Sequence, residues 1–231
     1  MTYSHRLTAK SKAALIMFAA VLMVYLATRL FMSSLYSHQA ILFLEDWHSK
    51  QVLPSEQAWS VAKQAMLKAE AWAPVQDAFL QEKLGKVYEW HSYSEAFGSE
   101  LVHKDRMTAL NSYRKQAQLT PLWPNAWLNI MAIKIQLNEY DVEFSKAMIK
   151  AEEATKGHPK GVYRLAEIGI QAWPNLSSPQ KSKILKMIGL SVTQKKSNAV
   201  TLKPLLDQRG LLPMVCYYLK VSNIKSYKLC Y

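Results

Sequence analysis

The chain has 231 residues, with 29 lysines and arginines against 17 acidic residues, and only seven glycines. This length suits one domain with a real core, or a membrane anchor plus one domain. A hydrophobic content of 50% excludes extensive disorder, and the scarcity of glycine argues against a strand-rich protein. The formal charge of +12 allows an anionic partner without naming one, because the lysines are scattered and form no single block.

The N-terminal region has the pattern of a membrane anchor. Residues 1–12 contain Arg6, Lys10 and Lys12 and no acid. Residues 13–32 are mainly apolar, and their one charged residue, Arg29, lies near the end of the run and can snorkel to the interface. A buried core helix and a cleaved signal peptide are the alternatives, but the run is long for a signal peptide and no clear Ala-x-Ala site follows it. We predict a cytoplasmic basic leader over residues 1–12 and a transmembrane helix over residues 13–32.

Charge on the two sides of this segment predicts its orientation. Three basic residues precede it, whereas residues 33–50 contain one lysine, Lys50, against Glu45 and Asp46. The positive-inside rule then keeps the N-terminus in the cytoplasm and exports the rest of the chain. In a Gram-negative bacterium the protein would span the inner membrane once and carry a periplasmic helical domain.

The remaining chain reads as helices separated by proline and glycine breaks. We expect a juxtamembrane helix in residues 33–54, a helical domain over residues 55–195 and a C-terminal capping segment over residues 196–231. Ser55 and Ser178 are candidate N-caps, and Phe79 and Trp90 are expected to face the core. Residues 211–219 read as a closing helix or a short strand. The predicted domain helices span 55–72, 75–93, 104–119, 125–137, 142–155, 162–173 and 179–193.

Part of this domain resembles the tetratricopeptide repeat, a helix-turn-helix unit that stacks into superhelices. Residues 84–88, Leu-Gly-Lys-Val-Tyr, match the Leu-Gly-x-x-Tyr core of the repeat. A small residue, an aromatic residue, a terminal proline and a next-helix tryptophan follow. Gln81 replaces the tryptophan of the repeat and the interval after the first motif is too long, so the resemblance implies TPR-like hairpins without a regular array. The implied packing positions are Leu84, Gly85, Tyr88, Ala109, Tyr113, Pro121 and Trp127.

The sequence carries no motif for chemistry. It has no phosphate-binding loop, no dinucleotide glycine fingerprint and no His-Glu-x-x-His pair, and its six histidines have no metal-ligand spacing. We therefore expect a protein that is not an enzyme, with no catalytic, cofactor-binding or metal residues and no nucleic-acid partner. Cys216 and Cys230 fit no zinc motif; they could form a disulfide in an oxidising compartment or stay free.

Two further patterns concern surfaces. Trp72, Trp123 and Trp173 are almost evenly spaced and each is followed closely by proline, which suggests helical pairs separated by Trp-Pro corners. Several cations could decorate a groove between hairpins, although the sequence does not show that they converge. These cations are Arg114, Lys115, Lys134 and Lys150.

The whole arrangement resembles the VpsP-type family of polysaccharide-biosynthesis-associated proteins. The residues that carry the resemblance are Ala-Trp-Ala-Pro at 71–74, the motif at 84–88 and the run from Tyr113 to Trp127. The resemblance implies a membrane-anchored, non-catalytic accessory of exopolysaccharide or capsule biosynthesis, whose partners are other proteins of that envelope machine. A protein that binds the glycan directly, or processes it, and a general envelope-assembly or secretion chaperone are the alternatives.

Overall fold

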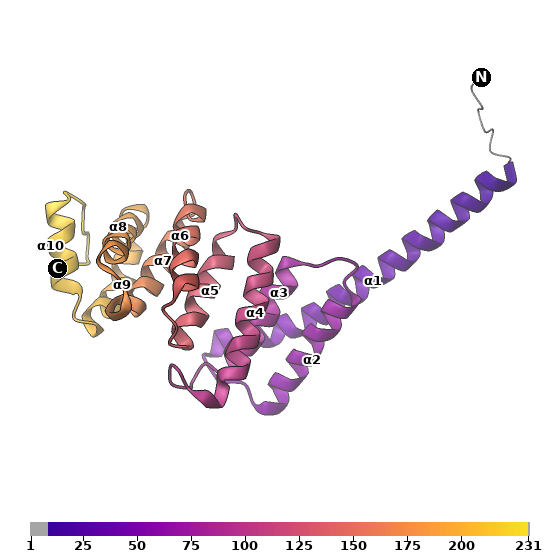
Figure 1. Cartoon of the computed structure of the whole chain (residues 1–231), viewed down its shortest axis with the longest axis horizontal. Helices are drawn as coiled ribbons and strands as arrows, with labels where there is room; N and C mark the ends of the chain where they lie inside the picture. Colours follow the sequence, from indigo (N-terminus) through magenta and orange to yellow (C-terminus); the bar gives the residue numbers. More distant parts are fainter. Residues whose placement is uncertain (1–8, 231) are drawn as a thin grey trace, which may run out of the picture.

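The computed structural model describes residues 9–230, which contain helices and no β-strand. The predicted all-α fold with a long apolar N-terminal helix is confirmed (Figure 1). Most of the predicted basic leader, including Arg6, lies outside the described residues. The helices are α1 (Ala9–Lys50), α2 (Glu56–Trp72), α3 (Ala78–His91), α4 (His103–Leu119), α5 (Pro124–Gln136), α6 (Val142–Ala154), α7 (Pro159–Ala172), α8 (Ser178–Gln194), α9 (Ser197–Gln208) and α10 (Leu212–Val221), with short 3-10 helices at Glu100–Val102 and Trp173–Asn175.

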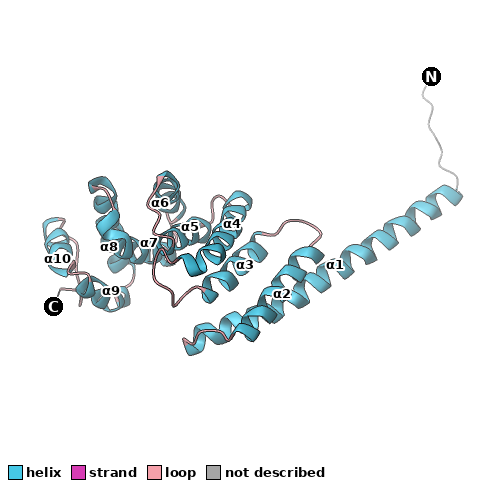
Figure 2. Ribbon diagram, turned by 60° about the horizontal axis from the view of Figure 1, so that its bottom comes forward, coloured by secondary structure: helices cyan, strands magenta, loops and turns pink. Residues whose placement is uncertain are grey.

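Consecutive helices pair into hairpins that stack side by side. α1 packs on α2, α3 on α4, α5 on α6 and α7 on α8, while α9 and α10 close the far end. The first helices of successive hairpins are also in contact: α1 contacts α3, α5 contacts α7, and α7 contacts α9. The stack extends away from α1, and the N- and C-terminal ends of the described chain lie at opposite ends of the molecule (Figures 1 and 2).

α1 changes its role along its length. The helix is long and apolar enough to span a membrane, and its most apolar 18-residue stretch is not buried against the rest of the protein. From Ser33 onward one stripe is buried, at the alternating spacing of four and three residues that faces a partner helix. The N-terminal part of α1 therefore projects from the domain, and its C-terminal part is the first helix of the first hairpin. The stripe is Ser33, Ser37, Ala40, Leu44 and Trp47.

Local signals set the helix ends. The Ser55 hydroxyl accepts from the Ala58 N–H at 3.2 Å, as predicted for the N-cap of α2. Gly98 and Gly157 have positive φ angles, which permits the turns before α4 and α7. The predicted cap of α8 was wrong by one residue: Ser177 is the N-cap, and its N–H donates to Gln180 Oε1 at 2.8 Å.

Two predictions about the core and the corners were wrong. Phe79 was expected to face inward but is 47% exposed, because the buried face of α3 begins one residue later, at Leu80, and continues through Leu84 and Val87. The Trp-Pro corners are not equivalent: Trp72 and Trp123 lie in turns between hairpins, whereas Trp173 lies within the α7–α8 hairpin. The even spacing therefore does not mark a structural repeat.

The C-terminal segment is helical. Residues 212–221 form a helix, which settles the choice between helix and strand. α9 precedes it and buries Ala199, Leu202 and Leu206, although Pro204 lies inside this helix. Cys216 of α10 and Cys230 form a disulfide, so the end of the chain is tied back onto the last helix.

Candidate functional site: the inner groove

Five of the predicted TPR-like positions meet where α3 packs on α4. Leu84, Ala109 and Tyr113 are buried, and Tyr88 is half-buried between the two core clusters of the domain. Gly85 lies directly beneath the Tyr113 ring, because a Cβ atom at this position would overlap the ring carbons. The glycine thus allows the two helices to approach closely, and the aromatic ring fills the space that it leaves.

The other two predicted positions meet at the corner between α4 and α5. The indole N–H of Trp127 donates to the carbonyl of Pro121 at 2.7 Å. Pro121 is exposed and Trp127 is half-buried against the main core. This hydrogen bond fixes the direction in which α5 leaves the turn. None of the seven predicted residues lines the groove described next; they position the helices that form it.

A groove of about 730 Å³ runs along the inner face of the stack. It is formed by the first helices of successive hairpins, α3, α5, α7 and α9, together with the C-terminal end of α1 and the loop after α3. Aromatic side chains lie at its α3 end, and glutamines and ionic groups lie along the rest. The residues that matter below are Lys86, Glu89, Trp90, Tyr93, Gln136, Arg164, Glu167 and Arg209.

Glu89 is the centre of a polar network in the groove wall. Its Oε2 atom accepts from Lys86 Nζ at 2.6 Å and from the Tyr113 hydroxyl at 2.5 Å, and its Oε1 atom accepts from Gln136 Nε2 at 3.3 Å. Burial alone would raise the pKa of the Glu89 carboxyl, but Lys86 and Tyr113 outweigh burial and hold this pKa below its ordinary value. Glu89 is therefore a carboxylate that joins α3, α4 and α5.

The far part of the groove contains ionic groups from later hairpins. Arg164 of α7 donates to Asn129 Oδ1 at 2.9 Å, and burial raises the pKa of the nearby Glu167 carboxyl above its ordinary value, partly offset by Arg164. Arg209, just after α9, is exposed at the groove edge. Sequence reasoning missed these residues. Lys86 lies inside the 84–88 motif with Glu89 three residues later, but Gln136 and Arg164 come from other hairpins.

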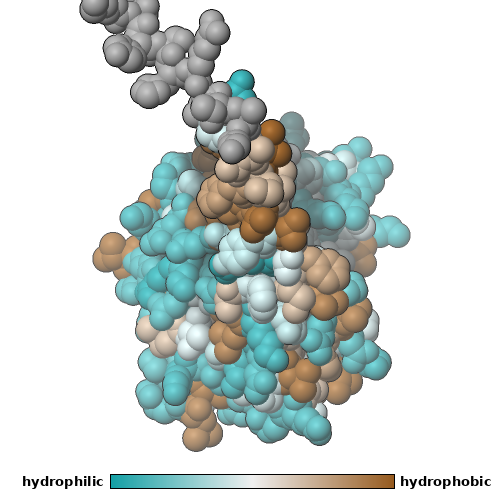
Figure 3. All heavy atoms as spheres, turned by 90° about the vertical axis from the view of Figure 1, so that its right-hand side faces the viewer, coloured by the Kyte–Doolittle hydropathy of each residue, from teal (hydrophilic) through white to brown (hydrophobic). Residues whose placement is uncertain are grey.

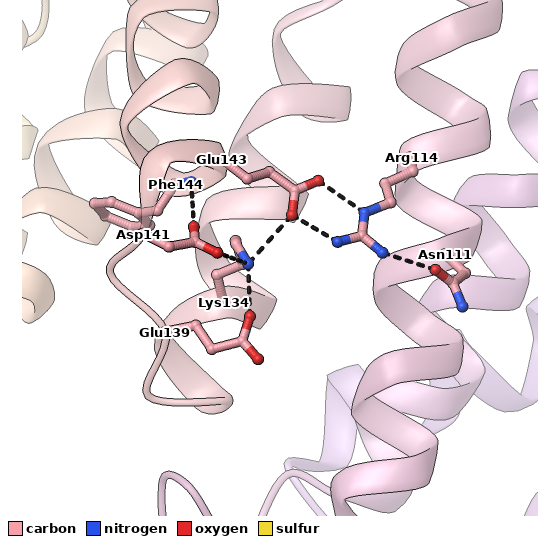
Figure 4. Close-up of polar contacts among 7 residues, drawn as sticks. All are labelled: Asn111, Arg114, Lys134, Glu139, Asp141, Glu143 and Phe144. Carbon is pink, nitrogen blue, oxygen red and sulfur yellow. Dashed lines mark hydrogen bonds and ion pairs between the residues drawn. The ribbon is translucent and has the colours of Figure 1, made fainter.

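The sequence suggested four cations as groove residues, but none of them lines the groove. Lys134 is almost fully buried and contacts Glu139, Asp141 and Glu143 at 2.6, 2.9 and 3.2 Å (Figure 4). Arg114 of α4 donates to both oxygens of Glu143, and the two cations keep the pKa of Glu143 below its ordinary value. This network fastens the α5–α6 turn to α4. The remaining two, Lys115 and Lys150, pair with Glu70 and Glu153.

A second missed residue is His91, at the end of α3. Its ring stacks on Trp59 with centroids 3.8 Å apart, while Lys63 lies 4.0 Å from the centroid of the same indole ring. Its Nδ1 and Nε2 atoms lie 2.6 Å from Asp105 and 2.8 Å from Glu56. Burial opposes the charged ring, but the two carboxylates outweigh burial and raise the pKa of His91 above its ordinary value.

The tryptophans do not gather on one surface. Trp47 and Trp59 are buried, whereas Trp72 and Trp123 are 38% and 49% exposed in separate turns. Trp90 lines the groove and packs at a tilt beside Tyr93, with ring centroids 5.4 Å apart. The groove therefore has one aromatic pair at its α3 end, without the row of exposed tryptophans expected of a glycan-stacking platform.

Comparison with known proteins gives no family assignment. No protein-family model matches the chain, and no curated protein sequence matches it. Within residues 9–230 no group of three or more His, Cys, Asp or Glu side chains is arranged to hold a metal ion.

Proposed function

We propose that this protein is a membrane-anchored, non-catalytic scaffold whose inner groove binds a segment of a partner protein. The groove carries this proposal: it draws side chains from α1, α3, α5, α7 and α9 and offers an aromatic pair, amides and ionic groups. Stacked helical hairpins commonly bind extended peptides or helices on such a face. Trp90 and Tyr93 would pack on an apolar side chain of the partner, and the glutamines would bond its backbone.

The contacts of Glu89 support a non-catalytic role. Both of its oxygen atoms already accept hydrogen bonds, from Lys86, Tyr113 and Gln136. A general base needs a carboxylate that is within reach of a substrate proton and able to take it. Glu89 is instead held as a structural anion within the groove wall.

The biological setting that we propose is an envelope machine that makes exopolysaccharide or capsule. Its support is the resemblance of residues 71–74, 84–88 and 113–127 to the VpsP-type family. In this setting the partners are other proteins of the same machine.

We further propose a single-pass inner-membrane protein with a cytoplasmic N-terminus and a periplasmic domain. Lys10 and Lys12 precede the apolar part of α1, and Glu45 and Asp46 follow it, which is the charge bias of a cytoplasmic N-terminus. The disulfide between Cys216 and Cys230 supports the same orientation, because such bonds persist in oxidising compartments.

A second candidate function is direct binding of an acidic polysaccharide. The C-terminal region, residues 168–231, contains ten lysines and arginines and one acid, Asp207. The sequence analysis treated the lysines as scattered and did not single out this region. An anionic polymer would be attracted to this end of the stack.

Site-specific photocrosslinking in native membranes tests the scaffold. A photoreactive side chain would replace Gln171 or Gln208, which line the groove on α7 and α9. Matched controls would carry it at Ile149 or Leu190, which are 48% and 38% exposed on α6 and α8 and do not line the groove. We expect protein adducts from the groove positions and few from the controls.

The identity of the adducts separates the proposals. Polymerase, copolymerase or export components would support the polysaccharide scaffold, whereas pilus or outer-membrane assembly proteins would favour a general assembly chaperone. Recovery of polymer without protein would favour direct glycan binding. Equal protein adducts from groove and control positions would remove the groove as the binding surface.

A further inference from the structure

The turn between α2 and α3 is attached to the end of the apolar part of α1. Arg29 Nη2 donates to the carbonyls of Ala71 and Ala73 at 2.7 and 3.1 Å, and Arg29 Nε donates to the carbonyl of Trp72 at 3.0 Å. A helix C-terminus leaves these carbonyls without intrahelical partners and favours a cation beside it. Arg29 therefore caps the C-terminal end of α2 and holds the α2–α3 turn against the part of α1 around residue 29.

A second hydrogen bond supports this attachment. Ser33 Oγ donates to the carbonyl of Ala69 at 2.8 Å, four residues further along α1. Ser33 is also the first buried residue after the exposed apolar run, whose last side chains include Phe31 at 66% exposure. The α2–α3 turn thus lies where α1 passes from an exposed apolar helix to a packed one.

The turn presents apolar side chains outward. Trp72, Val75 and Phe79 are 38%, 72% and 47% exposed. They adjoin the apolar part of α1, whose hydrophobic side chains stand in front of a mixed surface in the view along that helix (Figure 3). Tryptophan is favoured at the boundary between lipid and water because its ring is apolar and its N–H is polar. We call residues 72–79 the anchor corner.

The charged groups around the anchor corner fit a lipid surface. Lys83 Nζ lies 5.0 Å from the centroid of the Phe79 ring, so an ammonium flanks the apolar side chains. The acids of this region are turned to protein partners. Glu70 accepts from Gln81 Nε2 at 2.7 Å, and Asp77 accepts from the Phe79 N–H at 2.8 Å. Glu82 accepts from Gln116 Nε2 at 2.8 Å, and its other oxygen lies 3.6 Å from Lys83 Nζ. A lysine beside aromatic rings is typical of residues at membrane interfaces.

We propose that the anchor corner is a second membrane contact, which lies in the headgroup region of the leaflet where α1 emerges. This inference rests on the membrane anchorage proposed above. A single helix leaves a domain free to turn and tilt above the bilayer, whereas a second contact beside it restricts that motion. The corner would therefore set the direction in which the inner groove faces relative to the membrane.

Environment-sensitive labelling of the full-length protein in lipid vesicles tests this contact. Three variants, Val21→Cys, Val75→Cys and Val142→Cys, would each carry a nitrobenzoxadiazole dye; the native cysteines form a disulfide and do not react without reductant. Val75 and Val142 are both highly exposed, at 72% and 84%, but Val142 starts α6 at the opposite edge of the stack. Val21 lies in the apolar part of α1.

We expect the dye at residue 75 to emit further to the blue than the dye at residue 142, and to lose emission when shallow nitroxide lipids are added. The dye at residue 21 should respond most to deep nitroxide lipids. If residue 21 is quenched while residue 75 behaves like residue 142, the corner contact is overturned and the anchor stands. If residue 21 is not quenched either, the anchorage itself fails. A second label, at Phe79→Cys, repeats the test within the corner.

Discussion

The middle and the end of the chain differ in their balance of basic and acidic residues. Residues 33–167 contain 15 basic and 16 acidic residues, whereas residues 168–231 contain ten basic residues and one acid. In the first region several cations are bonded within the fold: Lys134 contacts three carboxylates and Lys86 contacts Glu89. In the second region Lys183 pairs with Glu152 of α6 at 2.7 Å. Asp207 is the single acidic residue within residues 168–231.

This difference distinguishes cations that are bonded within the fold from exposed cations that are available to a partner. Removing one partner of a buried, bonded cation leaves an uncompensated charge and destabilises the fold, and such a cation has no capacity left for recognition. An exposed cation contributes little to stability and adds to the attraction of an anionic partner. We therefore expect substitutions of the buried cations in residues 33–167 to change mainly stability, and substitutions of exposed cations in residues 168–231 to change mainly binding.

The largest expected effect is that of Arg106→Ala. Arg106 is 1% exposed, and its guanidinium donates to the carbonyls of Ser92, Glu95, Ala96 and Gln136 at 2.7–3.1 Å. Its removal leaves buried carbonyls without donors and opens a cavity, which together should cost at least about 3 kcal/mol. The measurement is urea unfolding of the full-length protein in detergent micelles, followed by helical circular dichroism.

The matched control is Arg209→Ala in the basic region. Arg209 is exposed at the groove edge, so its replacement should change the free energy of unfolding by no more than about 0.5 kcal/mol. Equal losses for the two variants would contradict the division between structural and available charge.

Two glycines on helices from the two regions give the next largest contrast. A Cβ atom at Gly85 would overlap the buried Tyr113 ring, whereas one at Gly189 would approach the movable Cδ1 atom of Ile224 at 3.0 Å. Gly85→Ala should therefore destabilise the protein by about 1–3 kcal/mol, because the ring has no space to move into. In Gly189→Ala the gain in helix propensity, up to about 1 kcal/mol, should offset the contact. The same unfolding assay compares them, and a neutral Gly85→Ala would show that α3 and α4 are less tightly packed.

These glycines also show what a single sequence can predict. Most helix ends followed from proline, glycine and cap residues. The sequence of α2 also has a helical apolar stripe, and all of its residues are buried: Trp59, Ala62, Ala65, Met66 and Ala69. The signal is local in each case, because a helix face and its caps lie within a few turns. α9 was not predicted, since Pro204 interrupts its pattern and reads as a break.

The groove was harder to predict because it depends on distant hairpins. Glu89, Gln136 and Arg164 are separated by tens of residues, and only the stacking of α3, α5 and α7 brings them to one face. The same applies to Lys134, which looked like a surface cation. Its burial depends on the turn after α5 and on the start of α6, where its three carboxylates lie.

A smaller effect is expected from exposed lysines of the basic region. Changing Lys195, Lys196, Lys225 and Lys228 to glutamine removes four charges, each worth a few tenths of a kcal/mol in binding an anionic polymer. We therefore expect affinity for polygalacturonate to fall about tenfold at low salt. The control changes four exposed lysines of the first region, Lys104, Lys146, Lys156 and Lys160.

Calorimetric titration of the full-length protein in micelles measures both variants, with neutral dextran as a second ligand. A binding loss that is the same for the two sets of lysines would mean that only net charge matters. No measurable binding by the unmodified protein would remove the direct-glycan candidate and leave the scaffold unaffected.

The smallest predicted effect is a pH dependence from His91. Its two carboxylate partners, Glu56 and Asp105, raise its pKa in the folded protein above the ordinary value of 6.5. Below that ordinary value the ring is charged in both folded and unfolded chains, so the stabilisation is fully present. It is lost as the pH rises through the higher folded pKa, where the folded ring gives up its proton.

The free energy of unfolding of the native protein should therefore exceed that of His91→Gln by about 1 kcal/mol at low pH, and by less at high pH. Unfolding midpoints measured from pH 5.5 to pH 9 would show the change. His103→Gln is the control, because His103 is exposed at the first residue of α4. A difference between native protein and His91→Gln that stays constant across this range would mean that stacking on Trp59, which needs no charge, accounts for the contribution of His91.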